Sequence, residues 1–473
     1  MALTSQSGRW AARTLALICV LGLVAPAAVQ AVGPDRGDTA ASVGRQAGAV
    51  TDPANGTTVV SIQGFHFEGQ GSTKKPAGLV GVGPRGSTLW ELDGTKRGAT
   101  WFYDVDPLSN GNLLVVSTTP LGTVVFELNP ETRERVWEQQ FDIRDTHDVD
   151  MLPNGNLLVA NMRNWNESAG RSDDRLFVYN RTTDEVEWEW YFRNHYPAST
   201  DGGYAEDWSH VNDVDRIAEG RYLVSPRNFD QVIVVDRSTG EITERLGSDG
   251  NYDVLYEQHN PDWLVSESGD PTILVADSEN DRVVEYALRD GEWTEVWEVG
   301  VGGGLSWPRD ADRLPNGNTL ITDSLNHRVI EVTPRGEIVW EYYATWGPYE
   351  AERVAHGGGS NGPTMADLNA SGSYELSGSA GLTPGTGDGL TFPAAVQEVF
   401  AGTPLDTAAA GFAVQWSHVV PWIRPVWMGS WAFAGLACAL LVGLCWGAAE
   451  LVAARDRVVG ALRRAGRRVR TTR

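Results

Sequence analysis

Residues 146–162 have the sequence THDVDMLPNGNLLVANM, in which an Asp-x-Asp run is followed by an Asn-Gly turn and a short apolar run. Asn-Gly between β-rich runs is a strong hairpin signal. Two further runs, RLFVYNRTT and EVEWEWY, complete a unit of four short strands by Tyr191. These runs are short, alternate in polarity and have no helix caps between them, so the unit is predicted to be all-β.

The same unit recurs on both sides of this stretch. Residues 103–106, 213–215 and 310–312 each begin another unit, and the segment from His259 to Trp263 begins one more. Residues 78–92, GLVGVGPRGSTLWEL, resemble the last two strands of the final unit and so indicate a first unit upstream. Self-similarity at this spacing is typical of β-propellers. We therefore predict an all-β chain with a six-bladed β-propeller over residues 55–345.

The charge distribution separates the body of the chain from its ends. The formal net charge is -24, while residues 1–31 contribute +2 and residues 449–473 contribute +6, which leaves -32 for the middle. A body this acidic, with three lysines, argues against nucleic acid as a partner, because phosphate binding needs clustered cations. Its composition resembles that of halophilic, haloarchaeal secreted proteins. All three cysteines lie in the apolar terminal segments, so no disulfide framework is expected in the body.

Both ends have the character of membrane segments. Residues 1–31 carry Arg9 and Arg13 before an apolar run and are predicted to be a signal peptide or an uncleaved N-terminal anchor helix. Residues 425–449 are apolar and long enough for a transmembrane helix, and residues 450–473 form a basic tail. By the positive-inside tendency we expect a cytoplasmic C-terminus, with the propeller extracellular, on the extracytoplasmic side of the cell membrane. Residues 346–424 are Gly- and Ser-rich and are predicted to be a connector that partly closes the propeller.

The repeat register brings candidate functional residues together. Alignment of the units on their second Asp places five residues at one equivalent position, three residues earlier: Tyr103, His147, Asn212, His259 and Arg309. Equivalent positions of innermost strands converge near a propeller axis, so these side chains should share one mouth of the channel. His210 and Arg227 are expected on the same side. The aspartates themselves are expected to tie neighbouring blades by hydrogen bonds.

Three imidazoles and two guanidiniums at one mouth favour an anionic ligand. Arg presents a planar donor fork to oxyanions, and a neutral His can act as nucleophile or base. Three His residues are also able to hold a transition metal, but the adjacent Arg residues would repel a cation, so no metal is assigned. For each histidine alone, a hydrogen-bonded structural role remains an alternative.

These motifs resemble the arylsulfotransferase family. The likeness covers roughly residues 55–343, and its most specific parts are THDVDMLPNGNLLVANM, WSHVNDVD followed by SPRN, and EQHNPDW. The resemblance implies a six-bladed propeller that transfers a sulfuryl group between phenols through a sulfated histidine, without a nucleotide sulfate donor or other cofactor. It implies that His259 is the nucleophile and that His147, His210 and Arg227 bind the sulfate and assist the leaving oxygen. Asn212 fits the His-x-Asn pair of the family, and Tyr103 and Arg309 are expected to bind substrate.

The chain also departs from the family pattern. After His259 the usual LPNGN turn is replaced by LVSESGDP, the body has no cysteine, and the terminal membrane segment is unlike that of the soluble periplasmic members. The resemblance implies a small aryl sulfate and a phenolic acceptor as partners, and the apolar terminal segment adds a membrane. Two alternatives stay open: a non-catalytic surface propeller that binds anionic or glycan ligands, and a metal-dependent lactonase-like propeller with carboxylate and amide ligands at the axis.

Overall fold

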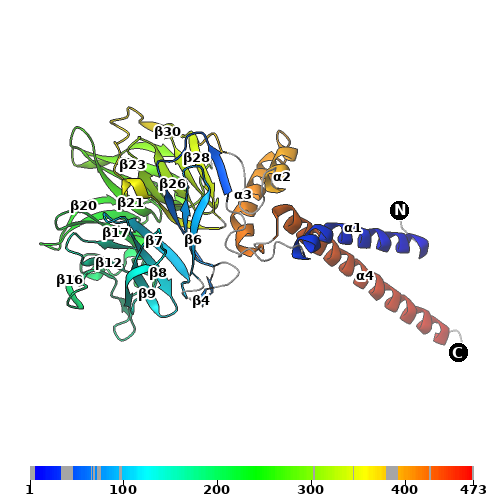
Figure 1. Cartoon of the computed structure of the whole chain (residues 1–473). Coiled ribbons are helices and arrows are strands. Elements are labelled where there is room, and N and C mark those ends of the chain that lie inside the picture. The colour runs from blue at the N-terminus through cyan, green and yellow to red at the C-terminus, as the bar shows by residue number, and fades with distance from the viewer. Residues whose placement is uncertain are drawn as a thin grey trace.

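The computed structural model describes residues 6–32, 46–64, 66–67, 70–71, 76–94, 98–301, 304–344, 346–379, 392–425 and 428–470. Its centre is a ring of six antiparallel sheets, each of which is one blade (Figure 1). The prediction of a six-bladed β-propeller is confirmed.

The blades follow one another along the chain, and five of them, blades 2 to 6, are each built from four strands that run in chain order from the axis outwards. Blade 2 consists of β7 (Trp101–Pro107), β8 (Leu113–Thr119), β9 (Gly122–Leu128) and β10 (Arg135–Phe141). Blade 3 consists of β11 (Val149–Met151), β12 (Leu157–Asn161), β15 (Arg175–Asn180) and β16 (Glu185–Tyr191). Blade 4 consists of β17 (Val211–Ala218), β18 (Arg221–Pro226), β19 (Gln231–Asp236) and β20 (Ile242–Gly247). Blade 5 consists of β21 (His259–Val265), β22 (Pro271–Asp277), β23 (Arg282–Arg289) and β24 (Glu292–Val299). Blade 6 consists of β25 (Pro308–Arg313), β26 (Thr319–Asp323), β27 (Arg328–Val332) and β28 (Ile338–Tyr343).

Blade 1 closes the ring with strands from both ends of the propeller sequence. Its outer strands are β2 (Thr58–Ile62), β5 (Gly78–Val82) and β6 (Thr88–Asp93), and its innermost strand is β29 (Pro348–Arg353). β29 pairs with β2 in antiparallel register, with Val60 opposite Ala351. The segment after residue 345 thus supplies a structural strand, and its pairing joins the first and last blades without leaving an open edge at the axis.

Two further strands widen neighbouring blades. β1 (Gln46–Val50) pairs with β28 as a fifth strand of blade 6, and β30 (Gly372–Tyr374) pairs in parallel with β24 of blade 5. Short elements in loops within blades are β3 (His66–Phe67), β4 (Gln70–Gly71), β13 (Trp165–Asn166), β14 (Arg171–Ser172) and the 3₁₀ turns η5 (Arg227–Phe229) and η6 (Ser278–Asn280). The 3₁₀ turns η3 (Phe192–Asn194) and η4 (Thr200–Gly202) connect blades 3 and 4, and η7 (Val354–His356) follows β29. Apolar cores lie between adjacent blades; one of them packs Leu158 and Val178 of blade 3 against Val224 and Ile233 of blade 4.

Carboxylates of the innermost strands tie most neighbouring blades together, as expected from the sequence. The Val105 N–H of blade 2 donates to Glu350 of blade 1 (2.7 Å), and the Ala351 N–H donates to Asp310 of blade 6 (3.0 Å). The corresponding N–H groups of Val149 and Val214 donate to Asp104 and Asp148. Blade 5 interrupts this pattern, because Pro261 stands where the other blades have an N–H donor, and Asp213 Oδ2 and Asn260 Oδ1 have no hydrogen-bond partner.

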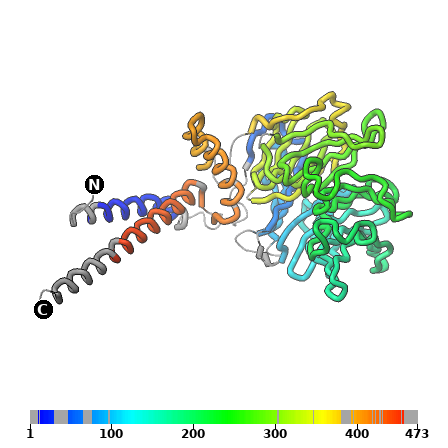
Figure 2. Tube along the Cα trace, turned by 180° about the vertical axis from the view of Figure 1, so that it is seen from behind, coloured from blue at the N-terminus to red at the C-terminus, as the bar shows by residue number. Residues whose placement is uncertain are grey.

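Helices outside the propeller connect it to two apolar segments. α2 (Phe392–Phe400) and α3 (Asp406–Ile423) lie between the propeller and the pair formed by α1 (Gln6–Val32) and α4 (Ser430–Arg470), as both views show (Figures 1 and 2). Residues 12–29 of α1 and 431–452 of α4 are long and apolar enough to cross a membrane. The two helices pack together: Arg13 forms a bidentate pair with Glu450, with both N–O distances at 2.7 Å, and Gly435 lies against the Leu23 carbonyl.

Candidate functional site

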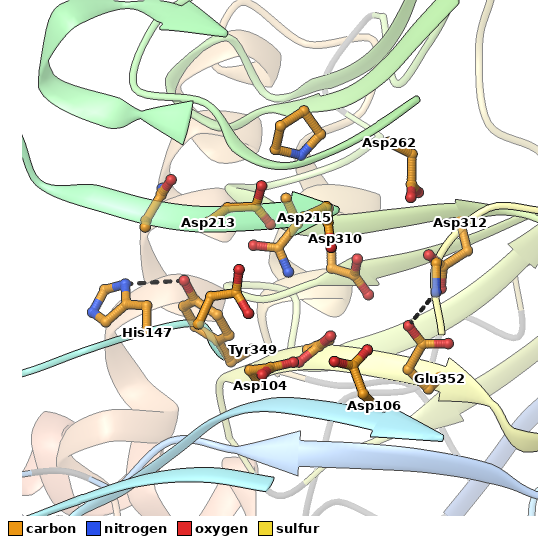
Figure 3. A pocket seen from close by; sticks show the side chains of 16 residues that line it. Asp104, Asp106, His147, Asp213, Asp215, Asp262, Asp310, Asp312, Tyr349 and Glu352 are labelled. Atoms are coloured by element: carbon orange, nitrogen blue, oxygen red, sulfur yellow. Dashed lines mark hydrogen bonds between the residues drawn. The ribbon is translucent and has the colours of Figure 1, made fainter. Parts of the chain in front are cut away.

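The innermost strands place six equivalent side chains at one mouth of the axial channel. Tyr103, His147, Asn212, His259 and Arg309 all lie there and are all at least 97% buried, as the register predicted. The sixth position, in blade 1, is occupied by Tyr349, which is 1% exposed. Figure 3 shows His147 and Tyr349 beside the carboxylates that line the channel below them.

Tyr349 is the central contact of this group. Its hydroxyl is 3.0 Å from His147 Nδ1, and its ring lies 6.2 Å from the His259 ring and 5.2 Å from the Arg309 guanidinium. Around it, the rings of Tyr103 and His147 stack at 3.9 Å, and His147 is 5.1 Å from His210. The structure therefore brings His147, His210 and His259 to one place, the mouth of the channel.

The hydrogen bonds of His259 determine its tautomer. Ser278 Oγ donates to the Pro308 carbonyl (2.6 Å), so its lone pair is left to accept from His259 Nδ1–H at 2.8 Å. The Glu257 carbonyl, which can only accept, lies 3.1 Å from the same nitrogen. Nδ1 therefore carries the proton, and Nε2 is a bare nitrogen with no hydrogen-bond partner although it is buried. A bare, buried imidazole nitrogen is the form required of a nucleophile.

His210 is held in the same way by a carboxylate. Asp207 Oδ2 accepts from His210 Nδ1 at 2.8 Å, and His210 Nε2 has no partner. Asp207 also binds Arg163, with Nε–Oδ1 at 2.9 Å, and Arg163 reaches Asp145 at 2.9 Å. Burial opposes ionisation of Asp207, but hydrogen bonds from His210 and Arg163, together with the charge of Arg163, hold the pKa of Asp207 well below its usual range. Asp207 thus stays ionised and fixes the orientation of the His210 ring.

All three imidazoles are neutral at neutral pH. Burial is the main cause that lowers the pKa of His259 and of His147 well below 6.5, and the charges of Arg309 and Arg227 lower it further. Burial, followed by Arg227, lowers the pKa of His210 to about 4, although Asp207 opposes this shift. The site therefore presents uncharged ring nitrogens beside permanent cations.

Two guanidiniums complete the site. Arg227 begins η5 and pairs with Glu257 (3.3 Å), while Arg309 lies 3.7 Å above the Trp307 ring and has an Nε without a hydrogen-bond partner. Asn212 donates its Nδ2 to the Gln258 carbonyl (2.9 Å), and its Oδ1 is unpaired. Tyr103 instead donates its hydroxyl to Asp145 at 2.6 Å. Arg227, Arg309 and Asn212 thus supply polar groups at the mouth, whereas the hydroxyl of Tyr103 is already engaged.

The backbone around the mouth is strained. His210, Glu257, Asn260 and Trp307 have positive φ values between 38° and 52°, a region that bulky residues seldom adopt. Such conformations concentrate where side chains must be aimed at a ligand. Three of the four flank or include the histidines, which supports a functional use of this mouth.

The channel below the mouth is acidic. Its narrow part, with a volume of ≈ 30 Å³, is lined by carboxylates that include Asp104, Asp148, Asp213 and Asp310. At the other end it widens to a basin of ≈ 580 Å³ lined by Asp106, Asp150, Asp215 and Asp262. Burial raises the pKa of Asp104, Asp148, Asp213 and Asp310, and the narrow part has no Arg or Lys among the described residues that line it, so the cations available to an anion are the guanidiniums at the histidine end. Among the residues that the structure describes, no group of three or more His, Cys, Asp or Glu side chains is arranged to hold a metal ion.

Sequence reasoning missed several of these residues. Tyr349 lies beyond the last unit recognised, yet Tyr349-Glu350-Ala351-Glu352 repeats Tyr103-Asp104-Val105-Asp106 with Glu in place of Asp, and this similarity was a usable signal. Ser278, Asp207 and Trp307 carry no sequence signal of their own, because their roles depend on which neighbours the folded blades bring to them.

Comparisons with solved structures give only low similarity. A protein of unknown function from Bacteroides caccae is 13% identical over 63% of this chain and 98% of its own, with a TM-score of 0.42. A catalytically inactive virginiamycin B lyase from Staphylococcus aureus with quinupristin is 11% identical over 63% of this chain and 88% of its own, with a TM-score of 0.38. These scores are too low to carry an argument about function.

The sequence comparisons are more informative. Curated protein sequences give no match to the chain. The family model described as arylsulfotransferase (ASST) matches residues 63–261, a segment that contains His147, His210, Arg227 and His259. This match supports the assignment of the propeller to the arylsulfotransferase family, which the sequence motifs also resemble.

Proposed function

We propose that the protein is a sulfotransferase that moves a sulfuryl group from an aryl sulfate to a phenolic acceptor, with His259 as the nucleophile. The observation that carries the proposal is the bare Nε2 of His259, which is buried, unpaired and held in one tautomer by Ser278 beside Arg309 and Arg227. The match of residues 63–261 to the arylsulfotransferase model supports the same reaction class.

In the first half-reaction, His259 Nε2 attacks the sulfur of the aryl sulfate. An N–S bond forms, the S–O bond to the aryl group breaks, and its electron pair leaves on the phenolate oxygen. In the second half-reaction, the acceptor oxygen attacks the same sulfur and the N–S bond breaks. The acceptor loses its proton, and this proton balances the one that the released phenolate takes up. A covalent intermediate of this kind divides one difficult displacement into two easier ones.

The neighbouring groups would stabilise the charge that develops. Arg227 and Arg309 supply N–H donors to the sulfuryl oxygens, and Arg309 has an unpaired Nε available for this. His147, whose Nδ1 is 3.0 Å from the Tyr349 hydroxyl, and His210 line the leaving-group side. The narrow channel beneath has no Arg or Lys in the part of its lining that the structure describes, so the guanidiniums that sulfate can bind lie at the mouth.

The location of the protein is part of the proposal. The apolar helices α1 and α4 support membrane association. By the positive-inside tendency, the basic residues that follow the apolar span of α4 favour a cytoplasmic C-terminus and a propeller on the extracytoplasmic side. In this arrangement no nucleotide sulfate donor is required at the site.

The test is the loss of the covalent intermediate. The His259→Ala variant should lose phenol release from an aryl sulfate by a factor of at least about 10³, and no sulfated peptide should be recovered at position 259. His195→Ala is the matched control, because His195 is a partly buried histidine stacked on Trp190 away from the mouth (4.3 Å). Full activity of His259→Ala would refute the proposal, and ligand binding by the wild type without turnover would favour a non-catalytic propeller that binds anions.

A further inference from the structure

The mouth of the histidine site and the contacts of α3 are on the same side of the propeller. Inner strands begin at this mouth, and the loops between second and third strands return to it. α3 meets this side of the propeller at three places. Trp422 of α3 lies against Gly347, just before β29, and the Trp422 ring is 5.8 Å from the ring of His327 in the β26–β27 loop. His418 of α3 interacts electrostatically with Asp281 of the β22–β23 loop.

These contacts link α3 to the site itself. Asp281 accepts the backbone N–H of Trp307 at 2.7 Å, and the Trp307 ring carries the Arg309 guanidinium at 3.7 Å. Gly347 is two residues before Tyr349 in the chain. α3 therefore lies along the rim of the mouth beside blades 5, 6 and 1. The loops that carry Arg163 and Asp207 border the mouth from blades 3 and 4.

The chain length limits how far the membrane can be from this rim. Trp422 contacts the propeller, and the apolar span of α4 begins nine residues later, at Trp431. Even a fully extended chain of that length covers at most about 30 Å. The helical turn at the end of α3 and the bond from Arg424 to the Met428 carbonyl shorten the path further. The mouth is thus close to the point where α4 enters its apolar span, as Figure 1 shows for α3 and α4.

The helices between the mouth and the span have the surface of an interfacial segment. α2 and α3 contain Glu398, Asp406 and His418 as their only ionisable side chains. Large apolar side chains are exposed on these helices and on the turn between them: Val399, Leu405, Phe412, Val414, Val419 and Ile423. An exposed apolar surface that is continuous with a membrane span fits the headgroup–acyl boundary of a bilayer.

From this placement we infer that the mouth of the histidine site faces the bilayer surface and that its aryl substrates are amphiphiles that reach it from the membrane. The orientation stands on the contacts of α3 alone, whereas the substrate class rests on the proposed function. Tyr349 and Trp307 at the mouth provide aromatic surface for an aryl group, and an attached alkyl chain would remain in the lipid. Each added methylene raises partitioning into the bilayer roughly fourfold, so the local substrate concentration rises steeply with chain length.

The orientation is tested without turnover. The full-length protein, with Cys19, Cys438 and Cys445 replaced by Ala, is labelled at Glu279→Cys on the mouth side or at Asn154→Cys in the opposite turn, two exposed positions. It is reconstituted in phosphatidylcholine vesicles that carry an energy-transfer acceptor at the bilayer surface. Transfer should be clearly stronger from position 279 than from position 154. Equal transfer, or stronger transfer from position 154, overturns the orientation even if the protein shows no sulfuryl transfer.

The substrate class is tested with two aryl sulfates that differ only in the length of an alkyl chain. In vesicles the wild type should show kcat/KM at least about 100-fold higher for the compound with four more methylenes. The Val419→Asp change on α3 should remove most of this preference and leave turnover of the short compound unchanged. Val265→Asp, an exposed apolar position on the opposite side, is the control and should keep the preference. Equal kcat/KM for both compounds in the wild type overturns the proposed substrate class.

Discussion

Ser278 provides the sharpest test of the proposed role of His259, because blade 6 contains its structural equivalent. Ser278 Oγ donates to the Pro308 carbonyl (2.6 Å) and accepts from His259 Nδ1. Ser324 Oγ donates to the Pro348 carbonyl in the same way (2.7 Å), at the same place between the second and third strands. Both serines are fully or almost fully buried. Only Ser278 supports a histidine, so Ser278→Ala and Ser324→Ala form a matched pair.

The two substitutions should have similar effects on stability and different effects on transfer. Each leaves a buried carbonyl without its donor, which costs about 1–3 kcal/mol of the free energy of unfolding. In Ser278→Ala, His259 Nδ1–H also loses its acceptor at 2.8 Å and keeps only the Glu257 carbonyl at 3.1 Å. This bond strengthens as positive charge develops on the attacked ring, so its loss raises the barrier by about 1.5–3 kcal/mol, or roughly 10- to 150-fold in rate.

The assay is single-turnover release of phenol from an aryl sulfate, combined with denaturant unfolding of each variant. The expected result is a comparable loss of stability in both variants and a slower sulfation step in Ser278→Ala alone. Equal sulfation rates in Ser278→Ala and Ser324→Ala would refute the reasoning that Ser278 sets the reactive tautomer of His259.

Further predictions concern pH and the membrane helices. The pKa of His259 lies well below 6.5, so its ring stays neutral as the pH falls through 6.5. The sulfation rate should therefore remain level near pH 6.5 and decline only at more acidic pH. A decline centred at or above pH 6.5 would contradict this prediction. The same shift means that the folded state binds fewer protons than the unfolded state, so this group reduces stability as pH falls below its unfolded pKa. The bidentate pair between Arg13 and Glu450 favours the uncleaved-anchor alternative for residues 1–31, and we predict that intact-mass measurement of the purified chain includes them. Arg13→Glu should loosen the α1–α4 pair and Arg13→Glu with Glu450→Arg should restore it, as measured by crosslinking between the helices; equal crosslinking in all three proteins would argue against the pair.

Much of the site was accessible from the repeat register. Tyr103, His147, Asn212, His259 and Arg309 converge because equivalent positions of innermost strands must surround one axis once the units close into a ring. The register failed at blade 1, whose innermost strand comes from the other end of the propeller sequence and carries Glu350 and Glu352 in place of aspartates. Tyr349 was missed for that reason, although it contacts His147 and His259 and lies beneath Arg309.

The sequence by itself determined the blades, because Asn-Gly turns and alternating polarity act over a few residues and recur in every unit. It also determined the apolar ends and the acidic body. Only the tertiary structure decided which nitrogen of His259 is bare, because Ser278 accepts from that ring at the end of a neighbouring strand and itself donates to the Pro308 carbonyl of the next blade. The placement of α3 on the mouth side likewise depends on long-range packing of Trp422 against Gly347, which no local pattern encodes.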